Sequence, residues 1–323
     1  MSTTPTTATL LARGEHWALY DKPAGMTVVG GRGVPRPTLL DVAIEQLGNA
    51  KPVHRLDKPT TGCTLVATTT FGQQVLSDAF RRRTVDKRYV AIVEGVPSWK
   101  TLVVDARLAR IDDPDLPRIG GKKAPLSIQT IDDNGERALT RLRVLAIGEG
   151  VALVEARPET GRMHQIRCHL AHVGFPIAGD RLYGATSTFV DDQELALHAW
   201  GVSFPRPEGG RGAGTAPVPS SWWAWAATRR LGLGALTEAM SAFEKQMSSP
   251  PPAKAPAKAP TTKQAGPTKQ GPARPGAAPR SAPPKDGGVR RPSSSTPPGR
   301  PRSTPGGAGA RSGPSRRGGP PGR

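Results

Sequence analysis

An abrupt change in composition near Lys245 limits how much of this chain can build a folded core. From Gln246 to Arg323 the sequence holds fifteen Lys and Arg residues, one acidic residue, Asp286, and no aromatic residue. Such a segment, dominated by Pro, Ala, Gly, Ser and basic residues, cannot bury enough apolar surface to offset the entropy lost on ordering its backbone. We therefore predict a flexible N-terminus over residues 1–14, one folded domain over residues 15–245, and a disordered basic tail over residues 246–323.

The positive charge is concentrated in this tail. Of the formal net charge of +19, +14 lies in residues 246–323 and +5 in residues 1–245. The smaller value is ordinary for a globular domain, whereas a flexible polycation is suited to the phosphates of a nucleic acid. A protein that only binds RNA, through this tail, is therefore one possible function.

Cysteine usage and hydropathy favour a cytoplasmic protein. The two cysteines, Cys63 and Cys168, form no CxxC pair, so neither a disulfide framework nor a thiolate zinc site is indicated. Residues 1–11 lack the pattern of a secretory signal, and nowhere do eighteen consecutive apolar residues occur, so we expect no membrane segment.

Hydrophobic periodicity predicts alternating strands and helices, followed by a hairpin. Thr38 is a credible N-cap for a helix that ends by Gly48, and Gly148 to Gly150 can turn the chain between two strands. Trp222, Trp223 and Trp225 read as packing anchors before a final amphipathic helix. The expected strands cover residues 17–21, 63–68, 87–93, 141–144 and 151–156, and the expected helices residues 39–47, 71–82, 164–173 and 233–247.

The segment from His54 to Gly62 places one carboxylate, Asp57, between the basic residues Arg55 and Lys58. Neighbouring cations favour the anionic form of the acid, which can then attack carbon or accept a proton. The same spacing also suits a structural salt bridge that anchors a loop. The residues alone leave both interpretations open.

A second segment, residues 157–170, is dense in hydrogen-bond donors. Arg167 is the natural partner for an acid, because its guanidinium can hold a carboxylate through two parallel hydrogen bonds. His164, His169 and His172 do not predict a metal site, since His164 and His169 are five residues apart and do not share a helix face.

Three blocks, HRLDKPTTG, VDKRYVAIVEG and ETGRMHQIRCHL, occur in this order and resemble the motifs of the RluA-type pseudouridine synthases. The resemblance extends from about Leu19, through the block from Gly174 to Gly184, to Trp200. It implies an α+β fold with a mixed, largely antiparallel central sheet flanked by helices, and an active-site cleft across the middle of that sheet.

The resemblance also implies an activity and roles for several residues. It makes Asp57 the catalytic aspartate, with Arg167 as its partner, in a reaction that converts uridine to pseudouridine in RNA without a cofactor. It implies that Tyr89 packs against the target base, that Ile166 helps to wall the pocket, and that Arg55 occupies space left by the extruded nucleotide. Further substrate contacts are expected from His54, Arg162, His164 and Gln165.

The expected substrate is a uridine in ribosomal or transfer RNA, bound by a monomer with no obligate protein partner. A uridine inside a stacked helix must be flipped out, and a basic rim would assist by holding phosphates. The rim candidates, which as a charge run could equally form a solvated helix end, are Arg81, Arg82, Arg83, Lys87 and Arg88.

Two questions stay open at the level of the sequence. Asp57 could act at C1′ of the sugar, assist elimination to a glycal, or add to C6 of the base. A hydrolase that uses Asp57 as a nucleophile is a further alternative, disfavoured because no water-activating pair or metal site is recognisable.

Overall fold

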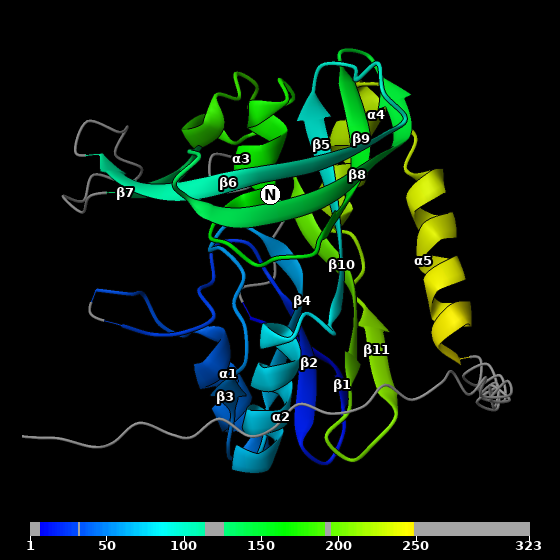
Figure 1. Cartoon of the computed structure of the whole chain (residues 1–323). Coiled ribbons are helices and arrows are strands. Elements are labelled where there is room, and N and C mark those ends of the chain that lie inside the picture. Colours follow the sequence, from blue (N-terminus) through cyan, green and yellow to red (C-terminus); the bar gives the residue numbers. More distant parts are fainter. Residues whose placement is uncertain (1–6, 32, 114–125, 191–194, 249–323) are drawn as a thin grey trace, which may run out of the picture. The chain divides into compact units, whose positions relative to one another are not determined.

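The computed structural model describes residues 7–31, 33–113, 126–190 and 195–248, and within them one large sheet carries all the strands (Figure 1). The strands are β1 Thr9–Arg13, β2 Trp17–Lys22, β3 Lys51–Pro52, β4 Thr61–Ala67, β5 Asp86–Glu94, β6 Thr101–Asp113, β7 Leu126–Ile131, β8 Glu136–Gly148, β9 Val151–Pro158, β10 Leu197–Pro205 and β11 Arg211–Thr215. The helices are α1 Leu39–Leu47, α2 Thr70–Arg81, α3 Gln165–His172, the short 3₁₀ helix η1 Arg181–Tyr183, α4 Ser220–Thr228 and α5 Gly234–Ser248.

The sheet is mixed and largely antiparallel, which confirms the predicted fold class. Its order is β1-β2-β4-β10-β5-β9-β8-β6-β7, with β3 paired to β4 and β11 paired to β10. Strand β10 runs parallel to β4 and antiparallel to β5, while the other strand pairs in the described residues are antiparallel. β10 thus joins two halves that are consecutive in the sequence.

Local sequence signals account for several element ends. Thr38 caps α1 through a reciprocal capping box with Asp41, and Gly48 ends the helix in the left-handed conformation at φ 76°, where a side chain would be strained. Between β8 and β9, Gly150 takes φ 68°, which allows the tight turn predicted there.

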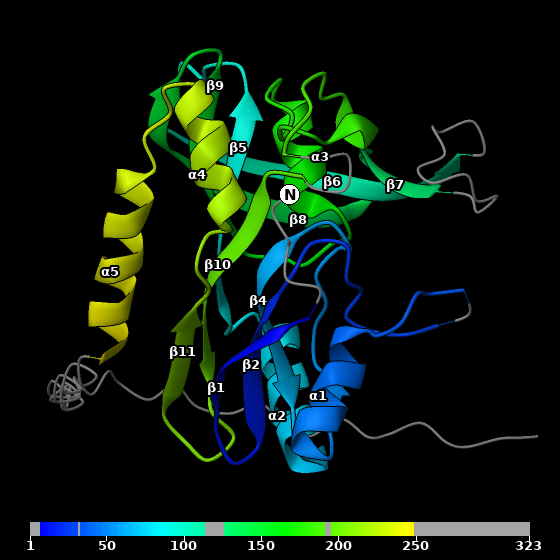
Figure 2. The same cartoon turned by 180° about the vertical axis from the view of Figure 1, so that it is seen from behind.

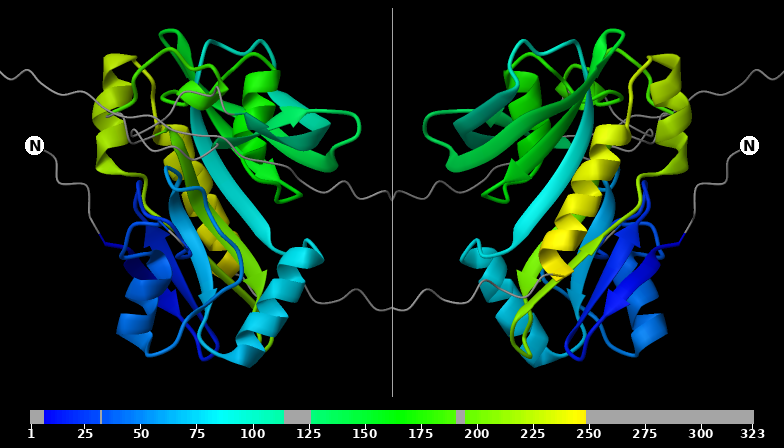
Figure 3. Two further views of the ribbon diagram at one scale, coloured as in Figure 1. Left: turned by 90° about the vertical axis from the view of Figure 1, so that its left-hand side faces the viewer. Right: turned by 90° about the vertical axis from the view of Figure 1, so that its right-hand side faces the viewer.

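Two large hydrophobic cores lie along the sheet, beside a small cluster of Leu108, Ala138 and Cys168. The first packs α1 and α2 against β2 and β4, with Leu19, Leu39, Leu65 and Leu76 fully buried. The second packs α3, α4 and α5 around β5, β9 and β10. Figure 2 shows α5 beside β10 and β11, and Figure 3 shows α1 and α2 at the end of the sheet opposite α3. Tyr89, on β5, packs against both cores.

Two helices, α4 and α5, form the C-terminal end of the described chain, and only α5 was predicted. Trp222, Trp223 and Trp225 precede the final amphipathic helix α5, as expected, but they lie within a helix of their own, α4. Trp222 is 1% exposed and packs in the core, whereas Trp223 is 48% exposed. Helix α5 covers Gly234–Ser248, close to the helix predicted over residues 233–247, so the first residues that composition assigned to the tail are helical. The rest of the predicted disordered tail lies outside the described residues.

In the part of the chain that the structure describes, we find no helix with the length and apolar character needed to span a bilayer. Cys63 and Cys168 are separate, buried thiols.

Candidate active site

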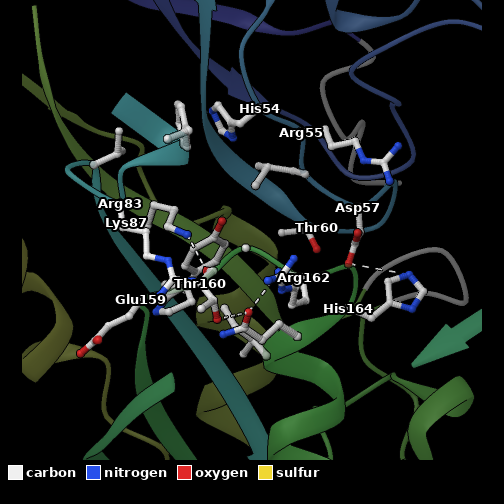
Figure 4. Close-up of a pocket in the computed structure, with 18 of the residues that line it drawn as sticks. His54, Arg55, Asp57, Thr60, Arg83, Lys87, Glu159, Thr160, Arg162 and His164 are labelled. Atoms are coloured by element: carbon white, nitrogen blue, oxygen red, sulfur yellow. Dashed lines mark hydrogen bonds and ion pairs between the residues drawn. The ribbon is translucent and has the colours of Figure 1, made fainter. Parts of the chain in front are cut away.

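A cavity of about 550 Å³ lies where the two cores meet (Figure 4). Its walls come from the loop between β3 and β4, from the end of α2 and the start of β5, and from the segment that joins β9 to α3. Asp57 and Thr60 belong to the first of these walls, and Thr160 and Arg162 to the last. The residues of the first and second motif blocks therefore face those of the third across one cavity.

Asp57 sits on the loop that precedes β4, where its side chain is 28% exposed. The N–H of Thr60 donates to the Asp57 carbonyl at 3.1 Å, which closes a turn directly after the aspartate. The N–H of Gly25 donates to the carbonyl of Lys58 at 3.0 Å. The backbone on the C-terminal side of the aspartate is therefore fixed, while the carboxylate faces the cavity.

Lys22 anchors the same loop from within the protein. Its side chain is fully buried, and its Nζ donates to the carbonyls of Pro23 and Met26 at 2.9 Å and to that of Lys58 at 3.1 Å. Burial lowers the pKa of Lys22 to about 7, against the opposing effect of the Asp57 and Asp21 charges. The lysine ties the loop after β2 to the loop that carries Asp57.

Gly62 sets the distance between β4 and β10 beside the site. Its φ is +104°, and an added Cβ would come within 2.3 Å of the Ala199 carbonyl oxygen. Next to it, the Thr61 hydroxyl lies 2.7 Å from Nδ1 of His198, whose Nε2 lies 3.2 Å from the Ala216 carbonyl oxygen. Any side chain at position 62 would push the two strands apart.

Arg167, on α3, approaches Asp57 from the opposite wall. Its Nη1 lies 3.8 Å from Oδ2 of Asp57, which is an ion pair but not a direct hydrogen bond. The two parallel hydrogen bonds expected of this guanidinium go instead to Asp180, from Nε and Nη2 at 2.7 Å each. Burial would lower the pKa of Arg167, but the Asp180 hydrogen bonds and the charges of Asp180 and Asp57 raise it.

His164 lies beside Asp57 and precedes α3. Its φ of 50° is left-handed, an uncommon conformation for a residue other than glycine. Its Nε2 is 3.9 Å from Oδ2 of Asp57 (Figure 4). Burial, and then the charge of Arg167, lower the pKa of His164.

Tyr89 and Ile166 line the cavity, and Ile166 is 6% exposed. Burial raises the pKa of the Tyr89 phenol, and the Asp57 charge raises it further. The resemblance had predicted Ile166 at the pocket wall and Tyr89 against the target base, and both side chains border the cavity.

His54 and Gln165 also line the cavity, but the protein itself engages Nε2 of His54 and the side-chain amide of Gln165. Nε2 of His54 accepts the N–H of Leu65 at 2.8 Å, and its ring stacks on Phe80 with centroids 4.5 Å apart. Gln165 bonds Thr160, the Arg162 N–H, Leu139 and Thr140. In this state both side chains shape the wall.

The basic rim contains only part of the predicted set. Arg55, Arg81, Arg83, Lys87 and Arg162 line the cavity. Arg82 is not among the lining residues and shares Asp78 with Arg81. Arg88 pairs with Asp86 and Glu155 while its guanidinium lies over the Phe243 ring. Lys87 donates to the Thr160 carbonyl at 2.8 Å, and burial, followed by the Arg83 charge, lowers its pKa to about 8.

Three residues of the site were not singled out from the sequence: Lys22, Asp180 and Tyr183. The last two stand in the block from Gly174 to Gly184, which belongs to the resemblance but was given no role. No cluster of His, Cys, Asp or Glu suited to a metal occurs among the described residues.

The sequence of this chain is similar to those of RNA pseudouridine synthases. A family model described as RNA pseudouridylate synthase matches residues 16–172. A Zymomonas mobilis protein named as an uncharacterized RNA pseudouridine synthase is 36% identical over 208 residues, covering 63% of this chain and 90% of that protein. The ribosomal large subunit pseudouridine synthase D of Nitrosomonas europaea is 36% identical over 215 residues, 62% of this chain but only 59% of the relative.

Solved structures show the same fold. The human protein named RNA pseudouridylate synthase domain containing 4 superposes with a TM-score of 0.56 at 26% identity, over 69% of this chain and 94% of that chain. The human protein named RNA pseudouridylate synthase domain containing 1 also superposes with a TM-score of 0.56, at 21% identity, over 68% of this chain and 86% of that chain.

Proposed function

Because this chain belongs to the RNA pseudouridylate synthase family, we propose that it converts uridine to pseudouridine in RNA, with Asp57 as the carboxylate that starts the reaction. The observation that carries the proposal is the placement of Oδ2 of Asp57 in a 550 Å³ cavity, 3.8 Å from Nη1 of Arg167 on the opposite wall. A cavity of this volume is within the range of small-molecule sites, so it can accept one nucleoside.

The reaction suits the groups present. The N1–C1′ bond of uridine breaks, the uracil turns, and a C5–C1′ bond forms, while C5 loses a proton and N1 gains one. Product and substrate are isomers, so no electrons are exchanged with another molecule. What the protein must supply is an anionic oxygen, a rigid pocket for the turning base, and a group that removes the C5 proton.

The residues have distinct roles in this proposal. The three routes for Asp57, attack at C1′, proton removal that yields a glycal, and addition at C6, all need an oxygen that no other group holds. Arg167 favours the anionic form of Asp57 through its charge, from 3.8 Å and without a direct hydrogen bond. Tyr89 packs against the uracil and Ile166 walls the pocket, while Arg55 occupies the space that the nucleotide leaves in the RNA.

The remaining pocket residues hold the nucleotide. Flipping a nucleotide costs a few kcal/mol, and the rim cations offset that cost by binding phosphates on either side of it. Arg162 and His164 have nitrogens at the cavity and serve as direct contacts. His54 and Gln165 keep the wall in shape and contact the substrate through their surfaces.

The substrate we propose is ribosomal or transfer RNA, with large-subunit ribosomal RNA tested first. Relatives from Nitrosomonas europaea and Vibrio cholerae are named ribosomal large subunit pseudouridine synthases. Since the chain spans only about three fifths of those relatives, the RNA has to be identified directly. Mapping pseudouridines in cells with and without this protein does so. We assign the reaction to residues 15–245 and added RNA affinity to residues 246–323.

Release of tritium from RNA labelled at C5 of uridine tests the proposal. Wild-type protein should release tritium without any added cofactor, and Asp57→Asn should not. Asp105→Asn is the matched control, because Asp105 lies on β6 in an exposed pair with Arg137 and should keep full activity.

The alternatives give different results in the same assay. RNA left unchanged by the wild type but bound tightly would indicate a protein that only binds RNA. Release by Asp57→Asn at the wild-type rate would eliminate the proposed role of Asp57.

A further inference from the structure

Tyr183, at the end of η1, contacts two residues that face Asp57. Its ring lies under the Arg167 guanidinium, 5.0 Å from centroid to Cζ. Its hydroxyl lies 3.0 Å from Nδ1 of His164 and accepts the N–H of Gln129, on β7, at 2.9 Å. The His164 and Tyr183 rings are nearly perpendicular, at 87°. One side chain therefore supports both donors on the far side of the catalytic carboxylate.

The contacts of the hydroxyl decide where its proton lies. A backbone N–H can only donate, so the phenol oxygen accepts from Gln129. The phenol then has one proton to give, and Nδ1 of His164 is the acceptor that the described residues offer to it. If Nδ1 carried a proton instead, the hydroxyl would accept two hydrogen bonds and its own proton would lack a partner in the protein, which is costly in a partly buried site.

We propose that Tyr183 is a positioning residue that fixes His164 as the neutral tautomer with its proton on Nε2, so that His164 presents an N–H to Oδ2 of Asp57. The catalytic consequence rests on the function proposed above, whereas the tautomer does not. Oδ2 then faces two donors, Nε2 of His164 at 3.9 Å and Nη1 of Arg167 at 3.8 Å. Both are too distant for a direct hydrogen bond.

This spacing has a chemical meaning. A donor in hydrogen-bond contact would stabilise the carboxylate and weaken it as a base or nucleophile. Two donors about one ångström further away leave the oxygen reactive and can move onto a neighbouring substrate oxygen. They also restrict the directions from which a nucleotide can approach.

The electrostatic surroundings are consistent with a neutral ring. The charged groups that face His164 are Arg167 and Arg55, which disfavour a proton, and Asp57 and Asp180, which favour one. Burial outweighs the two carboxylates and lowers the pKa of His164. Burial also raises the pKa of the Tyr183 phenol, so that it keeps the proton it donates.

Nitrogen NMR of the full chain labelled with ¹⁵N-histidine tests the tautomer in the absence of RNA. The chain has six histidines, and His164→Gln assigns the signals of interest. We expect a protonated Nε2 and an unprotonated, hydrogen-bonded Nδ1 in the wild type. In Tyr183→Phe, which keeps the ring under Arg167, the Nδ1 resonance should move towards that of an imidazole nitrogen with no partner. A protonated Nδ1 in the wild type, or a Nδ1 resonance unmoved by the substitution, would overturn the inference.

Kinetics supply the second readout. With saturating RNA, Tyr183→Phe should lower kcat by about 3- to 10-fold, the effect of one lost hydrogen bond, with little change in KM. Because the lost bond disfavours protonation of Nδ1, the acidic limb of the kcat profile should move to higher pH. An unchanged profile alongside a lower Tm would indicate a structural role only and would overturn the proposal.

A matched variant separates these effects from general loss of a tyrosine hydroxyl. Tyr20, on β2, donates to Oε1 of Gln46 at 3.0 Å, away from the cavity. Tyr20→Phe should leave the His164 signals and the pH profile as in the wild type. If the wild type released no tritium at all, the proposed function would fail while the NMR result would still decide the tautomer.

Discussion

Two carboxylates lie on either side of Arg167, and they are held in opposite ways. The Asp180 side chain is 1% exposed and accepts two hydrogen bonds of 2.7 Å from the guanidinium. The Asp57 side chain is 28% exposed and lies 3.8 Å from the remaining nitrogen. Asp180 therefore fixes the position of the arginine, and Asp57 does not have to do so. In the proposed function, Asp57 therefore keeps an oxygen that is not hydrogen-bonded to Arg167.

The largest expected effect is on the reaction rate, through substitution of Asp57. Asp57→Asn should lower the rate of pseudouridine formation by about 10⁴-fold or more. It should change the free energy of unfolding by no more than about 0.5 kcal/mol, because Arg167 keeps its bonds to Asp180. Single-turnover assays and urea unfolding of the same preparation measure both quantities. A large loss of stability would contradict the division of roles between the two acids.

The next largest effect is on the free energy of unfolding, through substitution of the buried Asp180. Asp180→Ala should cost roughly 3–5 kcal/mol, the usual result when one partner of a buried ion pair is removed and the other is left without compensation. Urea unfolding measures it.

A second substitution provides the control for this prediction. The double variant with Asp180→Ala and Arg167→Met should recover most of the lost stability, since no unpaired charge stays buried. A single variant as stable as the wild type would show that Asp57 can take over the anchoring role, which would remove the contrast.

A smaller effect on the free energy of unfolding is expected from His198, whose two ring nitrogens face Thr61 and Ala216. Burial lowers the pKa of His198 to about 4, against a raising effect from its bond to Ala216, compared with an ordinary value of 6.5. Between pH 6.5 and 4 the unfolded chain binds this proton and the folded chain does not, so stability is present above pH 6.5 and is lost as the pH falls. The expected loss is about 2 kcal/mol from pH 6.5 to 5 for this residue.

Comparison of wild type with His198→Gln isolates that contribution. The free energy of unfolding, measured with urea, should fall between pH 6.5 and pH 5 in both proteins, and this fall should be smaller in the variant by about 2 kcal/mol. Equal differences in the two proteins would mean that His198 is protonated in the folded state as well.

The smallest expected effect on stability is at the rim. Arg162 pairs with Glu136, which is 69% exposed, and exposed pairs of this kind contribute little. Arg162→Gln should therefore change the free energy of unfolding by no more than about 0.5 kcal/mol, while its slope of RNA affinity against salt falls by about one unit. An unchanged salt slope would place Arg162 outside the RNA contact.

Much of the local structure was predictable, because it depends on signals a few residues apart. The hydroxyl of Thr38, the glycines around residue 149 and the apolar spacing of α3 predicted element ends and types. The family motifs brought Asp57, Tyr89, Ile166 and Arg167 to one cavity. The strands that were not predicted are β1, β3, β6, β7, β10 and β11, and β1 lies in the segment expected to be flexible. Strand β10 pairs with β4 and β5, which lie far from it in sequence, whereas β11 forms a hairpin with β10.

What could not be predicted was the choice among partners. Arg167 was correctly expected to hold a carboxylate with two hydrogen bonds, but no sequence pattern says which of several acids it takes. His54 stands three residues before Asp57 in sequence, yet its Nε2 accepts the N–H of Leu65 on β4. The roles of Asp180 and Tyr183 depend on how the chain returns after α3, which spacing within the motifs does not encode.

The position of β10 in the sheet bears on synthesis of the chain. Strands β4 and β5 are separated by fewer than twenty residues in sequence, but β10, which starts at Leu197, lies between them. Asp57, Tyr89 and Arg167 are therefore synthesised before β10, the strand that pairs with both β4 and β5. Until β10 is synthesised, the edges of β4 and β5 that pair with it lack their partner, and exposed strand edges of this kind favour aggregation.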